Sequence, residues 1–372
     1  MTIVISANTS WYIWNFRLSL IRELLSCGHR VLAVSASDEW TKRLEDVGVS
    51  TVSVRLKTKS INPLRELITL VSYFRAYYRC GASLVLHYTP KANLYGSIAA
   101  RILGIPVINN VSGLGAAFSK KSKITALVAF MYRHAFRKAY KVFFQNADDR
   151  KHFLDAGLVS SGVCTLLPGS GVNLSLYTPC QADNEHFTFL FVGRLLKEKG
   201  VEDFLHAAAL VKTRTGKPVR FVLAGKHDPS DPHMADTSLL QLFLNNNIIE
   251  LTGQVEDIRE LLCHADCIVL PSYYREGVPR SLLEGAACGK PLIACDCVGT
   301  REPVENGVNG FLCKPEDPED LASKMMTMLE MDQDTRNLMG RESRRIAESR
   351  FDERIVIDEY LKAVDSLTAS KI

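Results

Sequence analysis

The chain has 372 residues, of which 47% are hydrophobic and 23% charged, and its formal net charge is +4. This length predicts about two domains, and the composition excludes disordered and collagen-like proteins. Residues 1–180 carry 22 Lys and Arg against 9 Asp and Glu, a net +13, whereas residues 181–372 carry a net −9. No Asp or Glu occurs between Glu66 and Asp148. Nucleic acid, an anionic membrane and a phosphorylated small molecule are the candidate partners of such a basic half.

In chain order, short apolar runs alternate with helical patterns, which predicts βαβ units and parallel sheets. The strands expected in the first half are Ile3–Ser6, His29–Ser35, Ser83–His87, Pro106–Val111 and Lys141–Gln145. The helices expected there are Asn15–Cys27, Leu64–Tyr78, Leu94–Leu103, Ile124–Ala139 and Asp148–Ala156.

The second half repeats this rhythm. Its expected strands are Phe187–Val192, Arg220–Ala224, Ile249–Leu251, Cys267–Leu270, Pro291–Ala294 and Gly310–Cys313. Its expected helices lie near 201–213, 237–246, 256–264, 280–288, 319–330, 335–349 and 352–367.

The polar segment Pro168–Glu185 is the expected linker between the halves. We therefore expect an α/β protein with two doubly wound, Rossmann-like domains over residues 1–178 and 179–350, and a last helix in 351–372 that packs back on the first domain. Ligands should bind at the carboxyl ends of the strands, in a cleft between the domains.

The segment from Tyr274 to Gly285 follows a buried strand and opens a helix, with Pro279 at an early helical position. Free N–H groups at a helix start favour an anion, so Gly277, Val278 and Ser281 are candidate phosphate contacts. Glu276 and Glu284 flank them and would repel phosphate. They are better suited to accept hydrogen bonds from sugar hydroxyls, although two solvated helix-end acids would give the same pattern.

A second segment runs from Gly193 to Gly200 after the strand Phe187–Val192. Arg194 and Lys199 supply a guanidinium fork and an ammonium point charge, which suit a diphosphate. The alternative is an exposed turn. Thr252, which follows the strand expected at Ile249–Leu251, is a further candidate donor contact.

Five segments of the second half carry a recognisable order and spacing: Gly193-Arg194…Glu198-Lys199-Gly200, Leu223-Ala224-Gly225, Pro271-Ser272, Glu276-x7-Glu284 through Pro291, and Glu305-Asn306-Gly307…Gly310. Together they resemble the family 4 glycosyltransferases with the GT-B fold. The resemblance implies an activated-sugar donor in the C-terminal domain, transfer with retention, and neither metal nor cofactor. It assigns Arg194 and Lys199 to the donor diphosphate, Glu276 to the sugar hydroxyls and Glu284 to the ribose.

The first half resembles a narrower branch through Trp11–Arg17, Pro90–Gly96 and Val111–Gly115. These segments look like bacterial enzymes that extend polyprenyl-diphosphate-linked sugars. Many family members carry a His where this chain has Ser112, so the role of that His cannot be transferred. Lys91 is a candidate catalytic cation, and Asn93, His87 and Ser112 are candidate acceptor contacts. A His at a strand end is, however, more often a satisfied core residue.

A basic helix is expected after Lys120-Lys121-Ser122-Lys123. Arg133, Arg137 and Lys141 are spaced four residues apart and should share one helix face, which suits anionic lipid headgroups or a lipid-linked diphosphate. A core helix with one solvated basic edge is the competing interpretation. Nucleic acid is disfavoured because the aromatic residues nearby follow a core-like helical spacing and no known nucleic-acid motif accompanies them.

Other patterns do not indicate a site. None of the ten cysteines forms Cys-x-x-Cys, which argues against a zinc ribbon, and Asp332-Gln333-Asp334 is expected to be a solvated turn. Ser281 lacks the Gly-x-Ser-x-Gly context of an acyl hydrolase. The sequence starts with a strand-like run instead of a signal peptide, and its longest apolar stretch is too short to span a bilayer.

We therefore expect a retaining transferase that moves a hexose or N-acetylhexosamine from a UDP-sugar to a polyprenyl-diphosphate-linked saccharide. It should be cytoplasmic, peripheral on the inner face of the cytoplasmic membrane, with an anionic membrane surface as partner and no nucleic acid. The alternatives are a GT-B enzyme with a soluble acceptor, a nucleotide-sugar epimerase, and a non-enzymatic module that binds nucleotide-sugar or nucleic acid.

Overall fold

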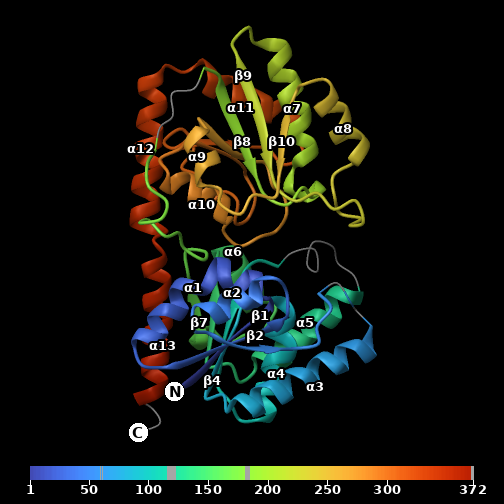
Figure 1. Cartoon of the computed structure of the whole chain (residues 1–372), viewed down its shortest axis with the longest axis vertical. Helices are drawn as coiled ribbons and strands as arrows, with labels where there is room; N and C mark the ends of the chain where they lie inside the picture. The colour runs from blue at the N-terminus through green and yellow to red at the C-terminus, as the bar shows by residue number, and fades with distance from the viewer. Residues whose placement is uncertain (59, 61, 115–122, 181–184, 370–372) are drawn as a thin grey trace. The chain divides into compact units, whose positions relative to one another are not determined.

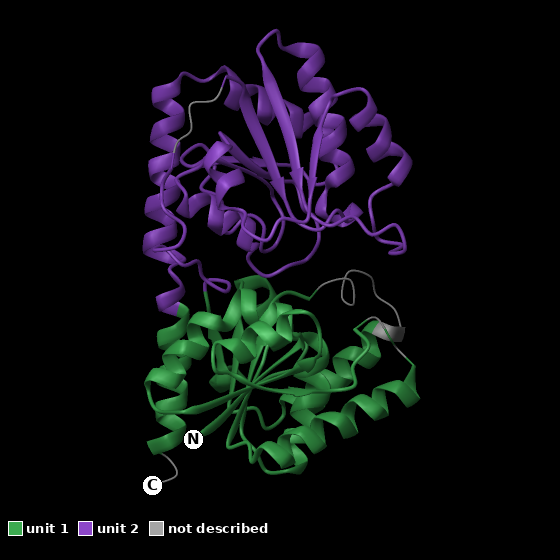
Figure 2. Cartoon of the chain, in the orientation of Figure 1, with its two compact units in different colours: residues 1–167, 356–372 green, residues 168–355 purple. Residues whose placement is uncertain are grey.

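The computed structural model describes residues 1–58, 60, 62–114, 123–180 and 185–369. The chain forms two compact units, as Figures 1 and 2 show: residues 1–167 with 356–372 form unit 1, and residues 168–355 form unit 2. The division falls at Leu167 and Pro168, earlier than the boundary expected at residues 178 and 179. Within the last helix, the residues from Val356 onward group with unit 1.

Unit 1 is built on a seven-stranded parallel sheet in the order β3-β2-β1-β4-β5-β6-β7. Its strands are β1 Thr2–Thr9, β2 Arg30–Ala36, β3 Ser50–Ser53, β4 Leu84–His87, β5 Val107–Val111, β6 Lys141–Phe144 and β7 Cys164–Leu166. Its helices are α1 Ser10–Ser26, α2 Trp40–Asp46, α3 Pro63–Cys80, the π-helix η1 Ala92–Gly96, α4 Ser97–Ile102, α5 Lys123–Phe136, α6 Ala147–Asp155 and the short 3₁₀ turn η3 Ser161–Val163.

Unit 2 is built on a six-stranded parallel sheet in the order β10-β9-β8-β11-β12-β13. Its strands are β8 Phe187–Val192, β9 Val219–Ala224, β10 Glu250–Gly253, β11 Cys267–Leu270, β12 Leu292–Cys295 and β13 Gly310–Cys313. Its helices are the 3₁₀ turn η4 Lys197–Lys199, α7 Val201–Arg214, α8 Thr237–Asn245, α9 Arg259–His264, α10 Arg280–Ala287, α11 Pro318–Glu330 and α12 Gln333–Arg350. The last helix, α13, spans Glu353–Ala369.

Each sheet has a point at which the strand order reverses. In unit 1 the chain winds outward from β1 in one direction and continues from β4 in the other, and in unit 2 the same reversal separates β8 from β11. Loops that leave neighbouring strands in opposite directions open a crevice at the carboxyl edge, which is where doubly wound sheets bind ligands. The predicted α/β class with two Rossmann-like sheets is confirmed.

The predicted basic helix face is wrong. Helix α5 ends at Phe136, and the Tyr140 N–H donates to the Val107 carbonyl at 2.9 Å, which draws the chain into the sheet. Lys141 is therefore the first residue of β6 and pairs with Ile108 instead of extending the helix. Arg137 likewise follows the helix end, so the three cations do not share a helix face.

Smaller differences concern short elements and helix ends. Helix α2 and strands β3 and β7 were not predicted, and the single helix predicted at Leu94–Leu103 is η1 followed by α4. Pro279 is the N-cap of α10, with extended backbone, instead of an early helical residue. Asp332 is more than a solvated turn residue, because its carboxylate caps α12 by accepting the Thr335 N–H at 2.8 Å.

Unit 1 buries polar side chains among its apolar core. His87 ends β4 with no exposed surface, and its ring lies between the Tyr77 hydroxyl, 2.9 Å from Nε2, and Asn109 Oδ1, 3.0 Å from Nδ1. Gly96 packs against this pair so closely that a Cβ would lie 2.5 Å from Nε2. Burial lowers the pKa of His87 to about 3 from its ordinary 6.5, so the ring is neutral in the folded state at pH 7.

Within the described parts of the chain, each helix is too short or too polar to traverse a bilayer.

Gly225→Ala should destabilise unit 2. Gly225 follows β9, and an added Cβ would lie 1.8 Å from the Gly193 carbonyl oxygen, so the two strand ends would have to separate. We expect a loss of about 1–3 kcal/mol in the free energy of unfolding, measured by chemical denaturation. Gly216→Ala is the matched control, because no heavy atom lies within 4 Å of its added Cβ. Equal stability of the two variants would contradict the close approach.

The buried His87 should make folding sensitive to acid. Because the folded pKa of about 3 lies below the unfolded 6.5, the unfolded state takes up the proton first. The contribution of His87 to the free energy of unfolding should therefore be constant above pH 6.5 and fall below it by up to about 1.4 kcal/mol per pH unit. Replacing His87 by Gln should remove this slope. Urea titrations between pH 4 and 7 test it, and parallel curves for the two proteins would show that His87 is not the cause.

Candidate functional site

Two loops at the carboxyl edge of unit 2 are tied together by one backbone oxygen. The Glu198 carbonyl, in the loop after β8, accepts the N–H groups of Tyr273 at 3.0 Å and Tyr274 at 2.9 Å, in the loop after β11. The Ser272 hydroxyl oxygen lies 3.4 Å from the same carbonyl oxygen. Gly200 permits this contact, since its φ is +73° and a Cβ would lie 2.3 Å from the Pro271 carbonyl oxygen. The two loops are therefore held side by side.

This junction brings Lys199 and Glu276 together. Lys199 Nζ lies 2.5 Å from Glu276 Oε2, and the two side chains are only 13% and 15% exposed. The other carboxylate oxygen of Glu276 accepts the Ser272 hydroxyl at 2.6 Å. Lys199 is therefore more than an exposed turn residue, and Glu276 is not a solvated acid. An ammonium has three N–H donors, and the pairing with Glu276 uses one of them.

The start of α10 is fixed by a neighbouring loop. A Cβ on Gly299, whose φ is +85°, would lie 1.8 Å from the Gly277 carbonyl oxygen, so only glycine fits beside this turn. The next residue, Thr300, donates its hydroxyl to the Ser272 carbonyl at 3.1 Å. Gly277 and Val278 are buried and Ser281 is half-buried. The first N–H groups of α10 thus belong to a rigid segment that begins directly after Glu276.

Glu284 lies in α10 and is 9% exposed. Its Oε1 accepts Arg280 Nε at 2.8 Å, one helical turn away, and the Tyr177 hydroxyl also hydrogen-bonds to it. Burial raises the pKa of Glu284, although Arg280 and Tyr177 act in the opposite direction. Arg280 and Tyr177 therefore hold the Glu284 carboxylate in one position, where it can accept hydrogen bonds.

The remaining donor candidates are exposed. Arg194 follows β8 and Gly193, and within the described ranges no ion pair holds its guanidinium. Thr252 is exposed near the end of β10, and its hydroxyl oxygen lies 3.4 Å from the Leu223 carbonyl oxygen and 3.3 Å from that of Gly253, either of which can accept its one hydrogen. The structure thus joins Lys199 to Glu276 directly. Arg194 follows β8 and Thr252 lies near the end of β10, and strand β9 separates the two at this edge of the sheet.

In unit 1, Lys91 is already engaged. Its ammonium donates to the Lys57 and Ser60 carbonyls, each at 2.8 Å, and pairs with Glu66 Oε1 at 2.6 Å. These three contacts use all three N–H donors. A phosphate would therefore have to replace one of these partners before Lys91 could stabilise its charge.

The acceptor candidates of unit 1 are mostly interior. His87 has both ring nitrogens bonded, and Asn93 is 2% exposed and donates to the Asn110 carbonyl at 2.8 Å. Ser112 is half-buried and donates to the Tyr88 carbonyl at 3.3 Å. Of the three, Ser112 is the one with appreciable exposed surface.

The basic residues near α5 are dispersed. Arg133 donates to the carbonyls of Ala156 at 2.9 Å and Gly157 at 3.2 Å, where α6 ends, so it has a structural role. Arg137 is exposed and Lys141 is half-buried in β6. Gly115 and the run Lys120-Lys121-Ser122 lie outside the described residues.

Arg17 is a buried cation that the sequence analysis did not single out. It lies in α1 with 2% exposure, and its guanidinium carbon is 4.1 Å from the centroid of the Tyr88 ring. Its Nε and Nη2 atoms have no hydrogen-bond partner among the described residues. Arg17 is the last residue of the Trp11–Arg17 segment, one of the segments that carry the family resemblance. Membership of that segment is the sequence feature that could have identified Arg17 as a candidate.

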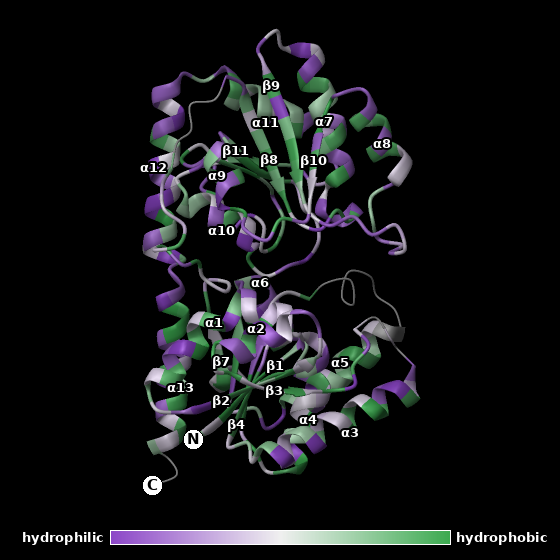
Figure 3. Ribbon diagram, viewed as in Figure 1, coloured by the Kyte–Doolittle hydropathy of each residue, from purple (hydrophilic) through white to green (hydrophobic). Residues whose placement is uncertain are grey.

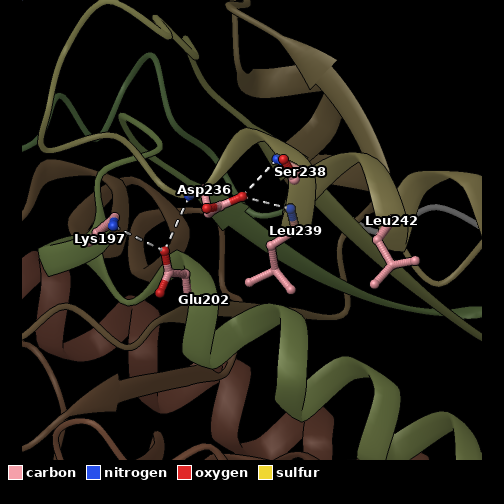
Figure 4. Close-up of a pocket in the computed structure, with 6 residues that line it drawn as sticks. All are labelled: Lys197, Glu202, Asp236, Ser238, Leu239 and Leu242. Carbon is pink, nitrogen blue, oxygen red and sulfur yellow. Dashed lines mark hydrogen bonds and ion pairs between the residues drawn. The ribbon is translucent and has the colours of Figure 1, made fainter.

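Figure 4 shows a pocket of unit 2 that borders the loop after β8 through Lys197. It is lined by Lys197, Glu202, Asp236, Ser238, Leu239 and Leu242. The Asp236 carboxylate accepts the N–H groups of Ser238 and Leu239 and so caps α8, while the Asp236 N–H donates to Glu202 at 3.2 Å. These polar groups hydrogen-bond to one another, and none of the residues predicted to bind the donor lines the pocket.

The cysteines and acids do not assemble a metal site. Cys295 and Cys297 have their sulfurs 3.3 Å apart, but no cluster of three or more His, Cys, Asp or Glu side chains suited to a metal occurs in the described ranges.

Comparisons with known families match both halves of the chain. The family described as "Glycosyl transferase 4-like domain" matches residues 13–169, and "Glycosyl transferases group 1" matches residues 186–331.

Curated relatives extend over nearly the whole chain. The N,N'-diacetylbacillosaminyl-diphospho-undecaprenol alpha-1,3-N-acetylgalactosaminyltransferase of Campylobacter jejuni is 28% identical over 95% of both chains. The UDP-Gal:alpha-D-GlcNAc-diphosphoundecaprenol alpha-1,3-galactosyltransferase of Escherichia coli is 24% identical over 84% of this chain and 82% of its own.

Solved structures share the fold. Anabaena HepE in complex with UDP and glucose has a TM-score of 0.81 and 21% identity, covering 98% of this chain and all of its own. Sucrose-phosphate synthase from Thermosynechococcus elongatus has a TM-score of 0.80 and 17% identity, with full coverage of both chains. Two Rossmann-like sheets and matches to both domain families lead to one conclusion: the chain is an enzyme of the group 1 glycosyltransferases, with the GT-B fold.

Proposed function

We propose that the enzyme transfers a hexose or N-acetylhexosamine, with retention, from a UDP-sugar to a polyprenyl-diphosphate-linked saccharide. The observation that carries this proposal is the Lys199–Glu276–Ser272 cluster at the carboxyl edge of unit 2, beside the start of α10. UDP in the HepE complex supports the donor class, and the C. jejuni and E. coli relatives, both named for undecaprenol-linked substrates, support the acceptor class.

The donor diphosphate would bind between Lys199, Arg194 and the first N–H groups of α10. Among the described residues, Lys199 keeps two donors beyond its bond to Glu276. Arg194 offers an exposed guanidinium, and Gly277 and Val278 lead into the helix start. As UDP leaves, negative charge grows on its phosphates. Donors already held in place stabilise that charge without reorganisation, which lowers the barrier.

The two acids would orient hydroxyl groups of the donor. Glu276 is held by Ser272 and Lys199 and would accept hydrogen bonds from the sugar. Glu284 is held by Arg280 and Tyr177 and would accept them from the ribose. Carboxylates fixed in this way select a hydroxyl-bearing ligand, because a missing hydroxyl would leave a desolvated acceptor unpaired.

The proposed reaction balances without a protein base. The bond between the anomeric carbon and the UDP oxygen breaks, and a bond from the acceptor hydroxyl oxygen to the same carbon forms on the same face. The acceptor proton passes to a phosphate oxygen of the departing UDP. We place the enzyme on the inner face of the cytoplasmic membrane, where a lipid-linked acceptor would present its saccharide.

Two variants test the donor assignment. Lys199→Ala and Arg194→Ala should each lower kcat by about 10²–10³-fold, because each removes a donor to the leaving diphosphate. Lys197→Ala is the matched control: Lys197 belongs to the same loop, is 49% exposed and pairs only loosely with Glu202, at 4.0 Å. UDP release and product mass measure turnover. Wild-type kcat in either variant would refute the assignment of that residue.

Product analysis separates the competing functions. Incubation with UDP-sugars or GDP-sugars and a polyprenyl-diphosphate-linked acceptor should yield one acceptor extended by a single sugar from a UDP donor. Product from a soluble glycan alone would indicate a soluble-acceptor enzyme, and an altered donor sugar without transfer would indicate an epimerase.

A further inference from the structure

Helix α3 turns an apolar line toward solvent. Leu64, Leu67, Ile68 and Val71 are 74%, 56%, 50% and 40% exposed, and they recur at the i, i+3, i+4, i+7 spacing of one helix face. The opposite face is filled by the residues that pack into the unit 1 core: Glu66, Thr69, Tyr73, Ala76, Tyr77 and Cys80. The buried side therefore begins with the polar residues Glu66 and Thr69, while the exposed side of the same N-terminal half is apolar and uncovered. Figure 3 shows the hydrophobic and hydrophilic segments that alternate along α3.

The exposed line continues into a basic, aromatic end. Arg75, Tyr78 and Arg79 follow Val71 at i+4, i+7 and i+8, and all three are exposed, Tyr78 by 73%. The structure gives no ion pair for either arginine within the described ranges. The only acid of α3, Glu66, faces inward and is paired with Lys91 at 2.6 Å. The solvent-facing side therefore carries positive charge and no negative charge.

From these observations, and resting on the proposed lipid-linked acceptor, we infer that the α3 face (Leu64, Leu67, Ile68, Val71, Arg75, Tyr78 and Arg79) docks on an anionic lipid bilayer. An interfacial helix has this arrangement: its apolar side chains enter the acyl boundary, its arginines lie at the headgroups and its tyrosine lies at the interface. A protein surface would meet the apolar line equally well, but charge complementarity favours the bilayer: no Asp or Glu occurs from residue 67 to residue 147.

A second helix near α3 also exposes apolar side chains. Helices α3 and α5 both pack against η1 and α4, and Figure 1 shows α3, α4 and α5 gathered on one flank of unit 1. Helix α5 exposes Leu127 and Phe130, each by 58%. The bilayer contact was predicted at Arg133, Arg137 and Lys141. We assign it to α3 instead, because Arg133 is hydrogen-bonded to the end of α6.

Vesicle binding of the full chain tests the inference. Wild-type protein should sediment with vesicles of phosphatidylcholine mixed with phosphatidylglycerol, and less with phosphatidylcholine alone. The double variant Leu67→Ser/Ile68→Ser should lower the partition coefficient at least about tenfold on both vesicles. Arg75→Gln/Arg79→Gln should lower it only on the anionic vesicles, and added salt should remove that difference. Leu242→Ser, at an exposed leucine of α8 in unit 2, should bind like wild type.

The outcomes are separable. The inference would be overturned if the wild-type protein bound neither kind of vesicle, or if Leu67→Ser/Ile68→Ser bound as well as wild type. If the wild-type protein were a dimer and this variant were a monomer that still bound vesicles, the α3 face would instead be a self-association face. Wild-type turnover of the variant on a short-chain, water-soluble polyprenyl-diphosphate acceptor would show that it is folded and active. Vesicle binding that depends on α3, in a protein without turnover on any acceptor, would support the inference while the proposed function fails.

Discussion

The geometry of unit 2 depends on the carbonyl oxygen of Glu198. It accepts two backbone N–H groups from the loop after β11, and so it joins loops that leave adjacent parallel strands. The junction lies at the reversal of strand order, where the two loops would otherwise diverge. Since the bonds involve the backbone, the side chains of Lys199 and Glu276 are brought together by the fold before any ligand arrives.

The same region contains a largely buried ion pair, which is stabilised by protein groups instead of water. Lys199 and Glu276 are mostly buried, and a buried pair is costly to form but even more costly to break by removing one partner. Ser272 satisfies the second carboxylate oxygen, which limits the desolvation cost. Arg17 in unit 1 shows the contrasting solution, in which aromatic ring faces surround a guanidinium that no described carboxylate pairs with. Both arrangements hold positive charge at the carboxyl edge of a doubly wound sheet.

Sequence patterns predicted the long elements well because apolar runs and periodicity are local properties. Strands β8, β11 and β13 match their predicted residues, whereas β3 and β7 are short, partly exposed strands at the sheet edges without an apolar run to mark them. The order and spacing of motifs located the loops of the candidate site.

The partners within the site were beyond sequence reasoning. Lys199 meets Glu276 across 77 residues, and Lys91 meets Glu66 across 25, so neither pair belongs to a helical or strand repeat. The burial of His87 and Arg17 likewise depends on packing from several elements. The helix face predicted for Arg133, Arg137 and Lys141 was wrong for a related reason. Hydrogen bonding to β5 draws the chain into the sheet after α5, so the four-residue spacing does not continue as a helix.

The membership of α13 in unit 1 has a consequence for the order of synthesis. Val356, Tyr360, Ala363, Val364 and Leu367 belong to the same apolar cluster as Ile5 and Phe143, and Tyr360 also accepts Asn110 at 3.0 Å. These residues follow all of unit 2 in the chain. The part of unit 1 that precedes unit 2 is therefore synthesised with part of its core uncovered, whereas the contiguous residues of unit 2 are all made before the last segment of unit 1. A stop codon placed directly after unit 2 would consequently damage the unit that was made first.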